Sequence, residues 1–218
     1  MSIIFPDVEL DGVKGVLIDI DNTLYEYKSV HEKTMRSCYK AFVQEIQTEF
    51  SFGDFMQAYT AKREHIVERL QNQGSCRSRL FVFQAILEEF GILGAYDKAF
   101  VYDEMYWDIF MQNMILDSKA KTFLIACHER KIPVCAVTDM QAHIQVRKLR
   151  ELGASKYIDY MVTSEEVGKE KPSSLMFSTA LEKLQLTVKD VIMVGDSMEK
   201  DIEGANALGI RSFHVAEE

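Results

Sequence analysis

Two aspartates, Asp19 and Asp21, follow the short apolar segment Gly15-Val16-Leu17-Ile18. In an extended segment, residues two positions apart point to the same face, so the two carboxylates would lie side by side. A simple turn cap is the alternative, but a pair of facing carboxylates costs stability unless a cation compensates the charge. A carboxylate can attack a phosphate ester when a cation screens the repulsion between the two anions. We expect that cation to be Mg²⁺, which prefers carboxylate and phosphate oxygens.

Three further polar clusters occur later in the chain, each near the end of a predicted strand. They are Thr138-Asp139, Lys169-Glu170-Lys171-Pro172, and Gly195-Asp196-Ser197 with Asp201 close behind. Ligands of an open parallel sheet bind beyond the carboxyl ends of its strands. The sequence therefore predicts that these clusters converge on Asp19 and Asp21.

The second cluster offers phosphate-binding groups. The Thr138 hydroxyl and the backbone N–H groups after it could meet phosphate oxygens near the start of the following helix. Simple helix capping explains Thr138 taken alone almost as well. The carboxylate of Asp139 would not favour a phosphate, so we expect only its backbone to bind substrate and its side chain to point away or towards the leaving group.

The last two clusters offer a cation and a metal ligand. Lys171 precedes Pro172, and as a compact positive charge it could bridge Asp19 and the phosphate. Lys169 is the competing candidate, and we place it on a solvated loop. Asp196 could hold Mg²⁺ together with Asp19, while Asp201 would ligate the metal, support its water shell or hold Lys171, with direct ligation the less favoured role.

The elements that must position these residues form an α/β pattern. Short apolar runs at 15–18, 132–137, 157–162, 191–194 and 210–215 alternate with helical patterns at 118–130, 141–152, 173–184 and 198–208. Such alternation predicts a doubly wound, parallel five-stranded sheet with a Rossmann-like core. Between the first two strands, four helical patterns at 31–50, 54–71, 78–90 and 97–114 are too long for one crossover, with Asp54 and Asp97 as expected N-caps. We therefore predict a core of residues 1–25 and 117–218, with an inserted helical cap domain at 26–116.

The ordered set of motifs resembles the haloacid dehalogenase superfamily of phosphohydrolases, with its DxDxT, hydrophobic-Thr, Lys-Pro and GDSxxxD motifs. The resemblance covers 13–25 and about 117–215, and the insert matches the family's type 1 helical cap in position and length. It implies that Asp19 attacks phosphorus to give an aspartyl-phosphate, which water then hydrolyses. It also implies that Asp21 protonates the leaving oxygen and later activates water, while its backbone carbonyl binds the metal. Asp139 departs from the Asn or Gly often found there.

The inserted helices should govern the choice of substrate. Arg77 and Arg79 flank Ser78 between two predicted helices and could hold an anionic leaving group through bidentate hydrogen bonds. Solvation, or pairing with a neighbour such as Glu88, is the simpler reading. The aromatic residues around Trp107 are expected to form the core of the last inserted helix.

Composition limits the partners. The chain has 25 Lys and Arg against 34 Asp and Glu, a net charge of −9, which argues against a nucleic-acid polymer as partner. The four cysteines lack the spacing of metal ligands, which indicates buried thiols in a reducing compartment. We expect a cytoplasmic protein with no signal peptide and no membrane span.

The leading hypothesis is a Mg²⁺-dependent phosphatase of a small phosphorylated metabolite, either a nucleotide or a sugar phosphate. A phosphomutase and a non-catalytic binding protein of the same fold stay open as alternatives. Hydrolytic dehalogenation is disfavoured, because that branch of the superfamily lacks the acid at the position of Asp21.

Overall fold

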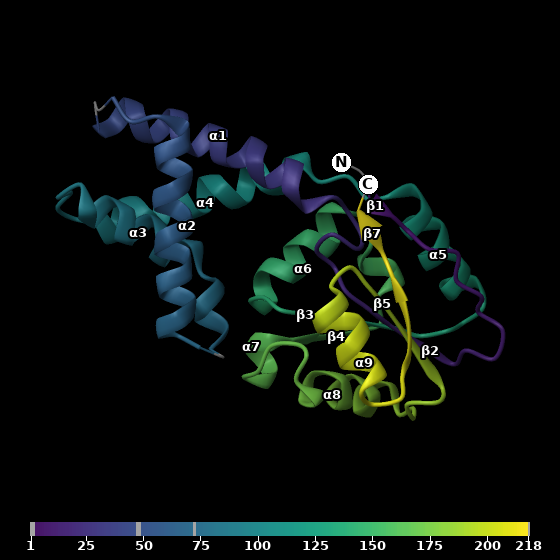
Figure 1. Ribbon diagram of the computed structural model, residues 1–218. Coiled ribbons are helices and arrows are strands. Elements are labelled where there is room, and N and C mark those ends of the chain that lie inside the picture. The colour runs from purple at the N-terminus through teal and green to yellow at the C-terminus, as the bar shows by residue number, and fades with distance from the viewer. Residues whose placement is uncertain (1–2, 47–48, 72, 218) are drawn as a thin grey trace. The chain divides into compact units, whose positions relative to one another are not determined.

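The computed structural model describes residues 3–46, 49–71 and 73–217 (Figure 1). Residues 47 and 48 of the helix predicted at 31–50, and residues 1, 2 and 218 of the predicted core, lie outside the described residues. The chain divides into two compact units, Met1–Tyr27 with Met114–Glu218 and Lys28–Asn113. We call them the core unit and the helical unit, and the role of residues 26–116 as a cap stays a prediction.

The core unit contains a five-stranded, wholly parallel sheet, as predicted. Its strands are β2 (Gly15–Ile18), β3 (Val134–Thr138), β4 (Tyr160–Thr163), β5 (Val191–Gly195) and β6 (Arg211–His214), in the order β4-β3-β2-β5-β6. Leu17 of the central strand is in register with Cys135 on one side and Met193 on the other. The strand order reverses at β2, so the segment after Ile18 emerges at the topological switch point, where ligands of such sheets bind.

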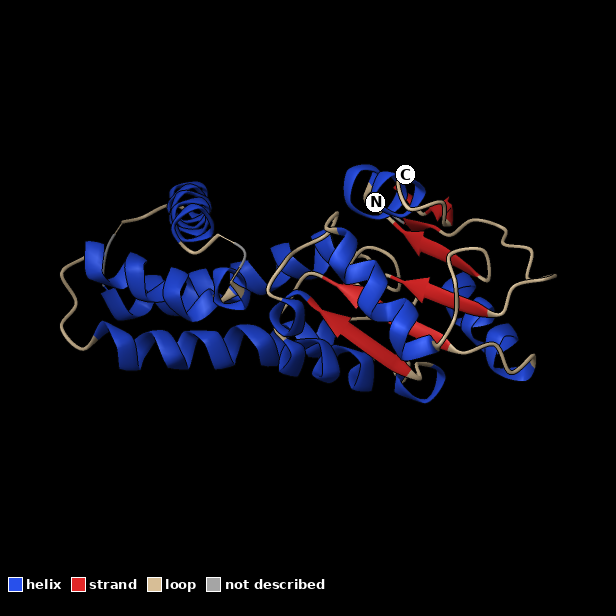
Figure 2. Ribbon diagram, turned by 90° about the horizontal axis from the view of Figure 1, so that it is seen from below, coloured by secondary structure: helices blue, strands red, loops and turns tan. Residues whose placement is uncertain are grey.

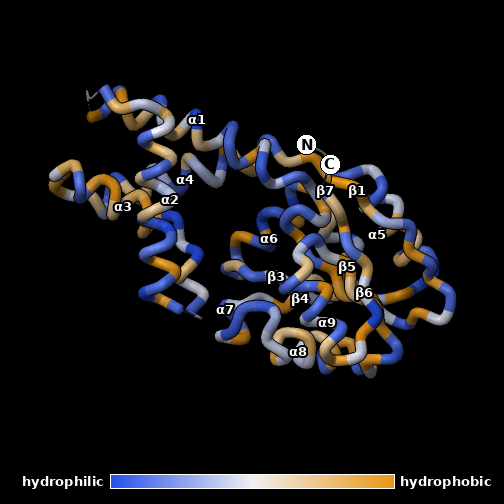
Figure 3. Tube along the Cα trace, viewed as in Figure 1, coloured by the Kyte–Doolittle hydropathy of each residue, from blue (hydrophilic) through white to orange (hydrophobic). Residues whose placement is uncertain are grey.

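Burial on both faces explains the apolar character of the three inner strands β2, β3 and β5, whereas the edge strands β4 and β6 are partly exposed. Leu17, Val137 and Met193 pack against Met176 and Phe177 in one cluster. The intervening strand residues are also buried and face the opposite side. Helices lie on both faces of the sheet (Figure 2), and Figure 3 shows hydrophobic residues gathered along its strands.

The helices of the core unit follow the predicted pattern except at 198–208 and at 164–167, where a short helix was not predicted. They are α5 (Ser118–Glu129), α6 (Ala142–Glu151), α7 (Ser164–Val167), α8 (Ser174–Leu184) and α9 (Gly204–Asn206). The single helix predicted at 198–208 is wrong, because a π-helical segment at Met198–Glu203 precedes the short α9. The carbonyl of Ser197 accepts from the N–H groups of both Asp201 and Ile202, which widens this turn. Such π turns are common at functional sites.

A small ribbon joins the two ends of the chain. Strand β1 (Ile3–Ile4) pairs antiparallel with β7 (Ala216–Glu217), and Figure 1 shows the N and C labels close together there. Two-residue strands carry too little periodicity to be recognised in a sequence, and they were not predicted.

The helical unit contains α1 (Tyr27–Ile46), whose first residue belongs to the core unit, α2 (Phe52–Arg69), α3 (Arg79–Glu89) and α4 (Ala95–Asn113), with a 3₁₀ turn at Gly74–Arg77. The expected N-caps are wrong. Ser51 caps α2 and Asp54 completes a reciprocal capping box with it, while Asp97 lies in the first turn of α4. None of the described helices is long and apolar enough to cross a membrane.

Buried aromatic rings form the core of the helical unit. The ring of Phe42 lies 5.2 Å from that of Phe55 and 5.3 Å from that of Phe90, and Tyr106 stacks on Phe110 at 5.6 Å. Trp107 is buried among them, as expected for the core of the last helix. Ring pairs at these separations stabilise a core beyond the area that they bury.

Candidate active site

A buried ion-pair network surrounds Asp19 at the carboxyl end of β2. The Lys171 ammonium donates to Asp19 Oδ1 at 2.7 Å, to Asp201 Oδ1 at 2.7 Å and to the Val137 carbonyl at 2.9 Å. Asp19, Lys171 and Asp201 are all buried, whereas Lys169 is exposed. The geometry therefore selects Lys171, rather than Lys169, as the lysine beside Asp19.

Local backbone geometry brings these side chains together. The N–H of Asp19 donates to the Val194 carbonyl at 2.9 Å, which fixes it beside the end of β5. A Cβ on Gly195 would lie 2.5 Å from the Asp201 carboxyl carbon, so only glycine leaves room for that carboxylate. The second oxygen of Asp201 accepts from the Ser197 N–H at 3.0 Å.

Three carboxylates crowd into this site. Asp19, Asp196 and Asp201 each place an oxygen within 4.8 Å of the others. Burial raises the pKa of Asp19 well above its usual range despite the charge of Lys171, and Asp201 and Asp196 raise it further. Burial also raises the pKa of Asp196 to about 6, with Asp201 adding to the rise. The cluster thus carries more negative charge than the Lys171 ammonium compensates.

This charge imbalance fits a divalent cation. Hard oxygen ligands suit Mg²⁺, and Asp19 and Asp196 are the carboxylates best placed to bind it. Both oxygens of Asp201 already accept hydrogen bonds, from Lys171 and from the Ser197 N–H. These contacts favour the predicted role of Asp201 in holding Lys171 over direct ligation. Burial alone would lower the pKa of Lys171, but Asp19 and Asp201 raise it above its usual value, so the ammonium stays charged.

Asp21 lies in a second network. The Lys148 ammonium donates to both of its carboxylate oxygens, at 2.6 Å and 2.9 Å, and the Tyr25 hydroxyl and the Gln145 side-chain amide also donate to it. Burial alone would raise the pKa of Asp21, but the charge and hydrogen bond of Lys148, with smaller contributions from Tyr25 and Gln145, lower it. After Asp21 the chain turns at Asn22, whose φ of 59° lies in the left-handed region that asparagine tolerates.

The second predicted cluster also reaches this region. The Thr138 hydroxyl is buried and accepts a hydrogen bond from the Gln145 amide at 2.5 Å. The side chain of Asp139 points to the loop at Lys171, where it accepts from the Lys171 N–H at 2.8 Å and from the Lys200 ammonium at 2.8 Å. Lys200 also contacts Glu170 at 3.3 Å. Asp139 therefore braces the loop that carries Lys171, and substrate contact through its backbone stays a prediction.

Sequence reasoning missed Gln145, Lys148 and Lys200. Gln145 and Lys148 are buried on α6 together with Ile144 and Leu149. In the sequence they occupy the apolar stripe of an amphipathic helix, which is an unusual place for a lysine and a glutamine. These two polar residues in an apolar stripe were the sequence signal that could have identified Gln145 and Lys148 as site residues. Lys200 had no comparable signal, because it is half-buried among ordinary charged residues.

Arg77 and Arg79 belong to the helical unit. The Arg79 guanidinium is buried and lies 4.5 Å from the centroid of the Tyr106 ring and 4.4 Å from that of Trp107. Arg77 ends the 3₁₀ turn and is half-buried. Glu88, the suggested partner, accepts instead from Gln84 at 2.8 Å. A role for the two arginines in binding substrate stays a prediction.

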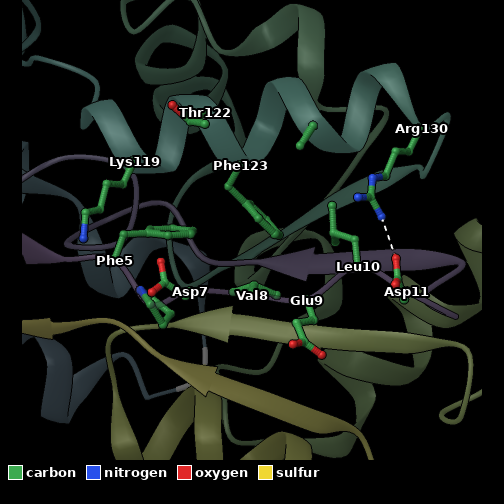
Figure 4. A pocket seen from close by; sticks show the side chains of 12 residues that line it. Phe5, Asp7, Val8, Glu9, Leu10, Asp11, Lys119, Thr122, Phe123 and Arg130 are labelled. Atoms are coloured by element: carbon green, nitrogen blue, oxygen red, sulfur yellow. Dashed lines mark hydrogen bonds and ion pairs between the residues drawn. The ribbon is translucent and has the colours of Figure 1, made fainter.

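A pocket of about 570 Å³ lies in the core unit between residues 5–11 and α5 (Figure 4). Asp7, Glu9 and Asp11 line it, and an Asp11–Arg130 ion pair of 3.0 Å crosses one end. The acidic cluster around Asp19 is not part of its lining. Two basic side chains, Lys119 and Arg130, also line the pocket, and none of the predicted site residues does.

Comparisons with known proteins identify a family and several related phosphatases. The family model described as haloacid dehalogenase-like hydrolase matches residues 13–209. The chain is 32% identical to a ribulose-1,5-bisphosphate 5-phosphatase of Halopiger xanaduensis, covering 94% of this chain and 86% of that protein. It is 28% identical to a glyceraldehyde 3-phosphate phosphatase of Methanopyrus kandleri, covering 93% and 84%.

Solved structures share the fold. A 2-haloacid dehalogenase of Pseudomonas syringae superposes with a TM-score of 0.72 at 19% identity, covering 93% of this chain and 86% of that one. At that identity the likeness shows the architecture alone. The assignment of this chain to a family rests on the family match and the sequence relatives. The chain belongs to the haloacid dehalogenase-like hydrolase family and is an enzyme of its phosphatase branch.

Proposed function

We propose that this enzyme hydrolyses a small phosphate monoester with Mg²⁺, through an aspartyl-phosphate formed on Asp19. The observation that carries the proposal is the buried cluster of Asp19, Asp196 and Asp201, in which Lys171 bridges Asp19 and Asp201 at 2.7 Å. A site with excess negative charge and one fixed ammonium suits a divalent cation and an anionic substrate.

Asp19 and Asp21 have different roles in the proposed reaction. An oxygen of Asp19 attacks phosphorus, the bond from phosphorus to the ester oxygen breaks, and Asp21, in its protonated form, gives its proton to the leaving oxygen. Asp21 then removes a proton from water, which attacks the aspartyl-phosphate, releasing phosphate and restoring the Asp19 carboxylate.

The remaining site residues bind the phosphoryl group or hold Lys171 in position. Lys171 and Thr138 would contact the phosphoryl oxygens, as positive charge and hydroxyl respectively. Bound Mg²⁺, held by Asp19, Asp196 and the Asp21 carbonyl, would supply charge that neutralises the transferring phosphoryl group. Asp139 and Asp201 keep Lys171 in place through the contacts described above.

A phosphorylated sugar is the substrate class that we favour over a nucleotide. Support comes from two relatives, a ribulose-1,5-bisphosphate 5-phosphatase and a glyceraldehyde 3-phosphate phosphatase. We also propose a reducing, cytoplasmic location, supported by the burial of the four cysteines Cys38, Cys76, Cys127 and Cys135.

The test is a panel of phosphate monoesters assayed with Mg²⁺ and with EDTA. We expect Mg²⁺-dependent release of phosphate, with Asp19→Asn lowering kcat by at least about 10⁴-fold. Asp190→Asn is the matched control, because Asp190 also pairs with a lysine, Lys14, but is absent from the acidic cluster.

Three outcomes would contradict the proposal. No hydrolysis of any ester would favour a binding protein, and isomerised substrate without free phosphate would favour a mutase. Full activity in Asp19→Asn would exclude the proposed nucleophile.

A further inference from the structure

Lys200 is a half-buried lysine on the π-helical segment Met198–Glu203. Its side chain is 34% exposed, and its ammonium donates to Asp139 Oδ2 at 2.8 Å and to Glu170 Oε2 at 3.3 Å. Asp139 directly follows β3, and Glu170 lies on the loop that carries Lys171. Three parts of the core unit that are far apart in the sequence therefore meet at one ammonium.

The other oxygen of Asp139 extends this chain of contacts to Lys171. Asp139 Oδ1 accepts from the backbone N–H of Lys171 at 2.8 Å. The Asp139 side chain is only 11% exposed, so its charge needs a partner within the protein. The Lys171 side chain in turn reaches from this loop to Asp19 and Asp201, at 2.7 Å from each. The place of the Lys171 ammonium beside Asp19 therefore depends on where the loop backbone lies.

The Lys200 ammonium separates two like charges at the edge of the site. Asp139 and Glu170 both contact it, so removing its charge would leave these two carboxylates close together. Like charges at such a distance repel each other, and the repulsion would act between the end of β3 and the loop that carries Lys171. Lys200 thus holds the loop against the end of β3.

We propose that Lys200 is a positioning residue that holds this loop in place, so that the Lys171 ammonium stays on the transferring phosphoryl group. The inference rests on the proposed function, in which Lys171 contacts the phosphoryl oxygens. A displacement of that ammonium by about 1 Å weakens its stabilisation of the transition state, so the loss appears in kcat. Lys200 itself contacts no substrate atom in this role.

The first experiment measures kcat and KM of Lys200→Met on the best ester of the panel at saturating Mg²⁺. We expect kcat to fall by about tenfold and KM to change by less than about threefold. Lys200→Arg, which keeps the positive charge, should retain kcat to within about threefold of wild type. A rise in KM with unchanged kcat would indicate direct binding of substrate and would overturn the positioning role. If Lys200→Met does not fold, Lys200→Gln replaces it with the same expectations.

Asp139→Asn gives a sharper test, because it removes a charge that Lys200 balances. An asparagine side-chain oxygen can still accept from the Lys171 N–H, so the loop keeps that hydrogen bond. The double variant Asp139→Asn/Lys200→Met should therefore recover kcat to within about threefold of wild type. A double variant as slow as Lys200→Met would show that charge balance does not hold the loop, and the inference would fail.

A double-mutant cycle with Lys171 tests whether Lys200 acts through it. In the Lys171→Met background, adding Lys200→Met should change kcat by less than about twofold, because the ammonium to be positioned is already gone. A further tenfold loss would show that Lys200 affects the reaction by another route and would overturn the inference.

Lys183→Met is the matched control. Its side chain is 29% exposed, close to that of Lys200, and its ammonium also joins two segments through Glu166 and the Met161 carbonyl. Neither partner is a proposed site residue, so we expect wild-type kinetics. A tenfold fall in kcat here would show that the loss of any such lysine slows the enzyme, and the effect of Lys200→Met would then carry no inference about Lys171.

Amide hydrogen exchange observes the loop without any turnover. We expect the Lys171 N–H to exchange at least about fivefold faster in Lys200→Met than in wild type, and to return towards the wild-type rate in Asp139→Asn/Lys200→Met. The Asp19 N–H, which donates to the Val194 carbonyl, should exchange as in wild type. If wild type hydrolyses no ester, the proposed function fails. If wild type is active and Lys200→Met leaves both kcat and the exchange of the Lys171 N–H unchanged, only the role of Lys200 fails.

Discussion

The two units bury different kinds of side chain. In the described part of the core unit the buried polar residues include Asp19, Thr138, Gln145, Lys148, Lys171 and Asp201, which meet beyond the carboxyl ends of β2, β3 and β5. In the described part of the helical unit, the buried polar residues are Thr34 and Arg79, and the rest of its core is dominated by aromatic and aliphatic side chains. Arg79 itself lies against two of the aromatic rings.

This difference indicates where the chain accepts a cost in stability. Buried charges contribute little or nothing to folding stability compared with well-packed apolar side chains. A dense network of them therefore points to chemistry, while an aromatic core points to a fixed scaffold. If this contrast is right, substitutions in the first region should mainly lower turnover, and substitutions in the second should mainly lower the free energy of unfolding.

After the loss expected for Asp19→Asn, the next largest effect is that of Lys171→Met on catalysis. The variant lacks the ammonium that contacts Asp19 and Asp201, so the transferring phosphoryl group loses a fixed positive charge. We expect kcat to fall by about 10³-fold on the best ester of the panel, measured as phosphate release at saturating Mg²⁺. Lys169→Met, two residues away and exposed, is the control and should keep wild-type kcat. Equal losses in both variants would contradict the assignment of Lys171.

Phe42→Ala should have the largest effect on stability in the helical unit. Phe42 is 1% exposed, and its ring packs against those of Phe55, Phe90 and Tyr102. We expect a loss of about 3–5 kcal/mol in the free energy of unfolding, measured by urea denaturation, because the cavity cannot close fully. Phe100→Ala, at a half-exposed phenylalanine, should cost less than about 0.5 kcal/mol. A small loss in Phe42→Ala would show that the aromatic cluster is not the scaffold of this unit.

The sequence predicted the sheet and the Asp19 network well because both depend on local signals. Apolar runs mark the parallel strands, and the residues that follow β2, β3 and β5 must meet at one edge once the sheet forms. The contacts of Asp21 could not be predicted, since Lys148 lies 127 residues away and meets Asp21 only in the folded chain. The π-helical turn after Ser197 was equally hidden, because no sequence pattern indicates that the N–H groups of both Asp201 and Ile202 donate to the Ser197 carbonyl.

The pH dependence of Mg²⁺ binding should show a smaller effect from the same acidic cluster. Burial raises the pKa of Asp196 to about 6, above the value of about 3.8 in the unfolded chain. In metal-free protein, the contribution of this group to stability is therefore present below about pH 3.8 and lost as pH rises through about 6. Mg²⁺ favours the ionised carboxylate, so its affinity should fall by at least about tenfold for each pH unit below about pH 6.

Titration calorimetry with Mg²⁺ at pH 7 and pH 5 measures this change directly, and the raised pKa of Asp19 acts in the same direction. Asp196→Asn is the informative variant. It keeps the size of the side chain and removes the proton that competes with the metal, so its affinity should be lower at pH 7 and should change less between the two pH values. Asp190→Asn, at an exposed ion pair with Lys14, should bind Mg²⁺ as wild type does at both. A wild-type affinity that does not change between pH 7 and pH 5 would mean that Asp196 is already ionised without metal, and the charge imbalance that distinguishes the core unit from the helical unit would then be smaller than the geometry implies.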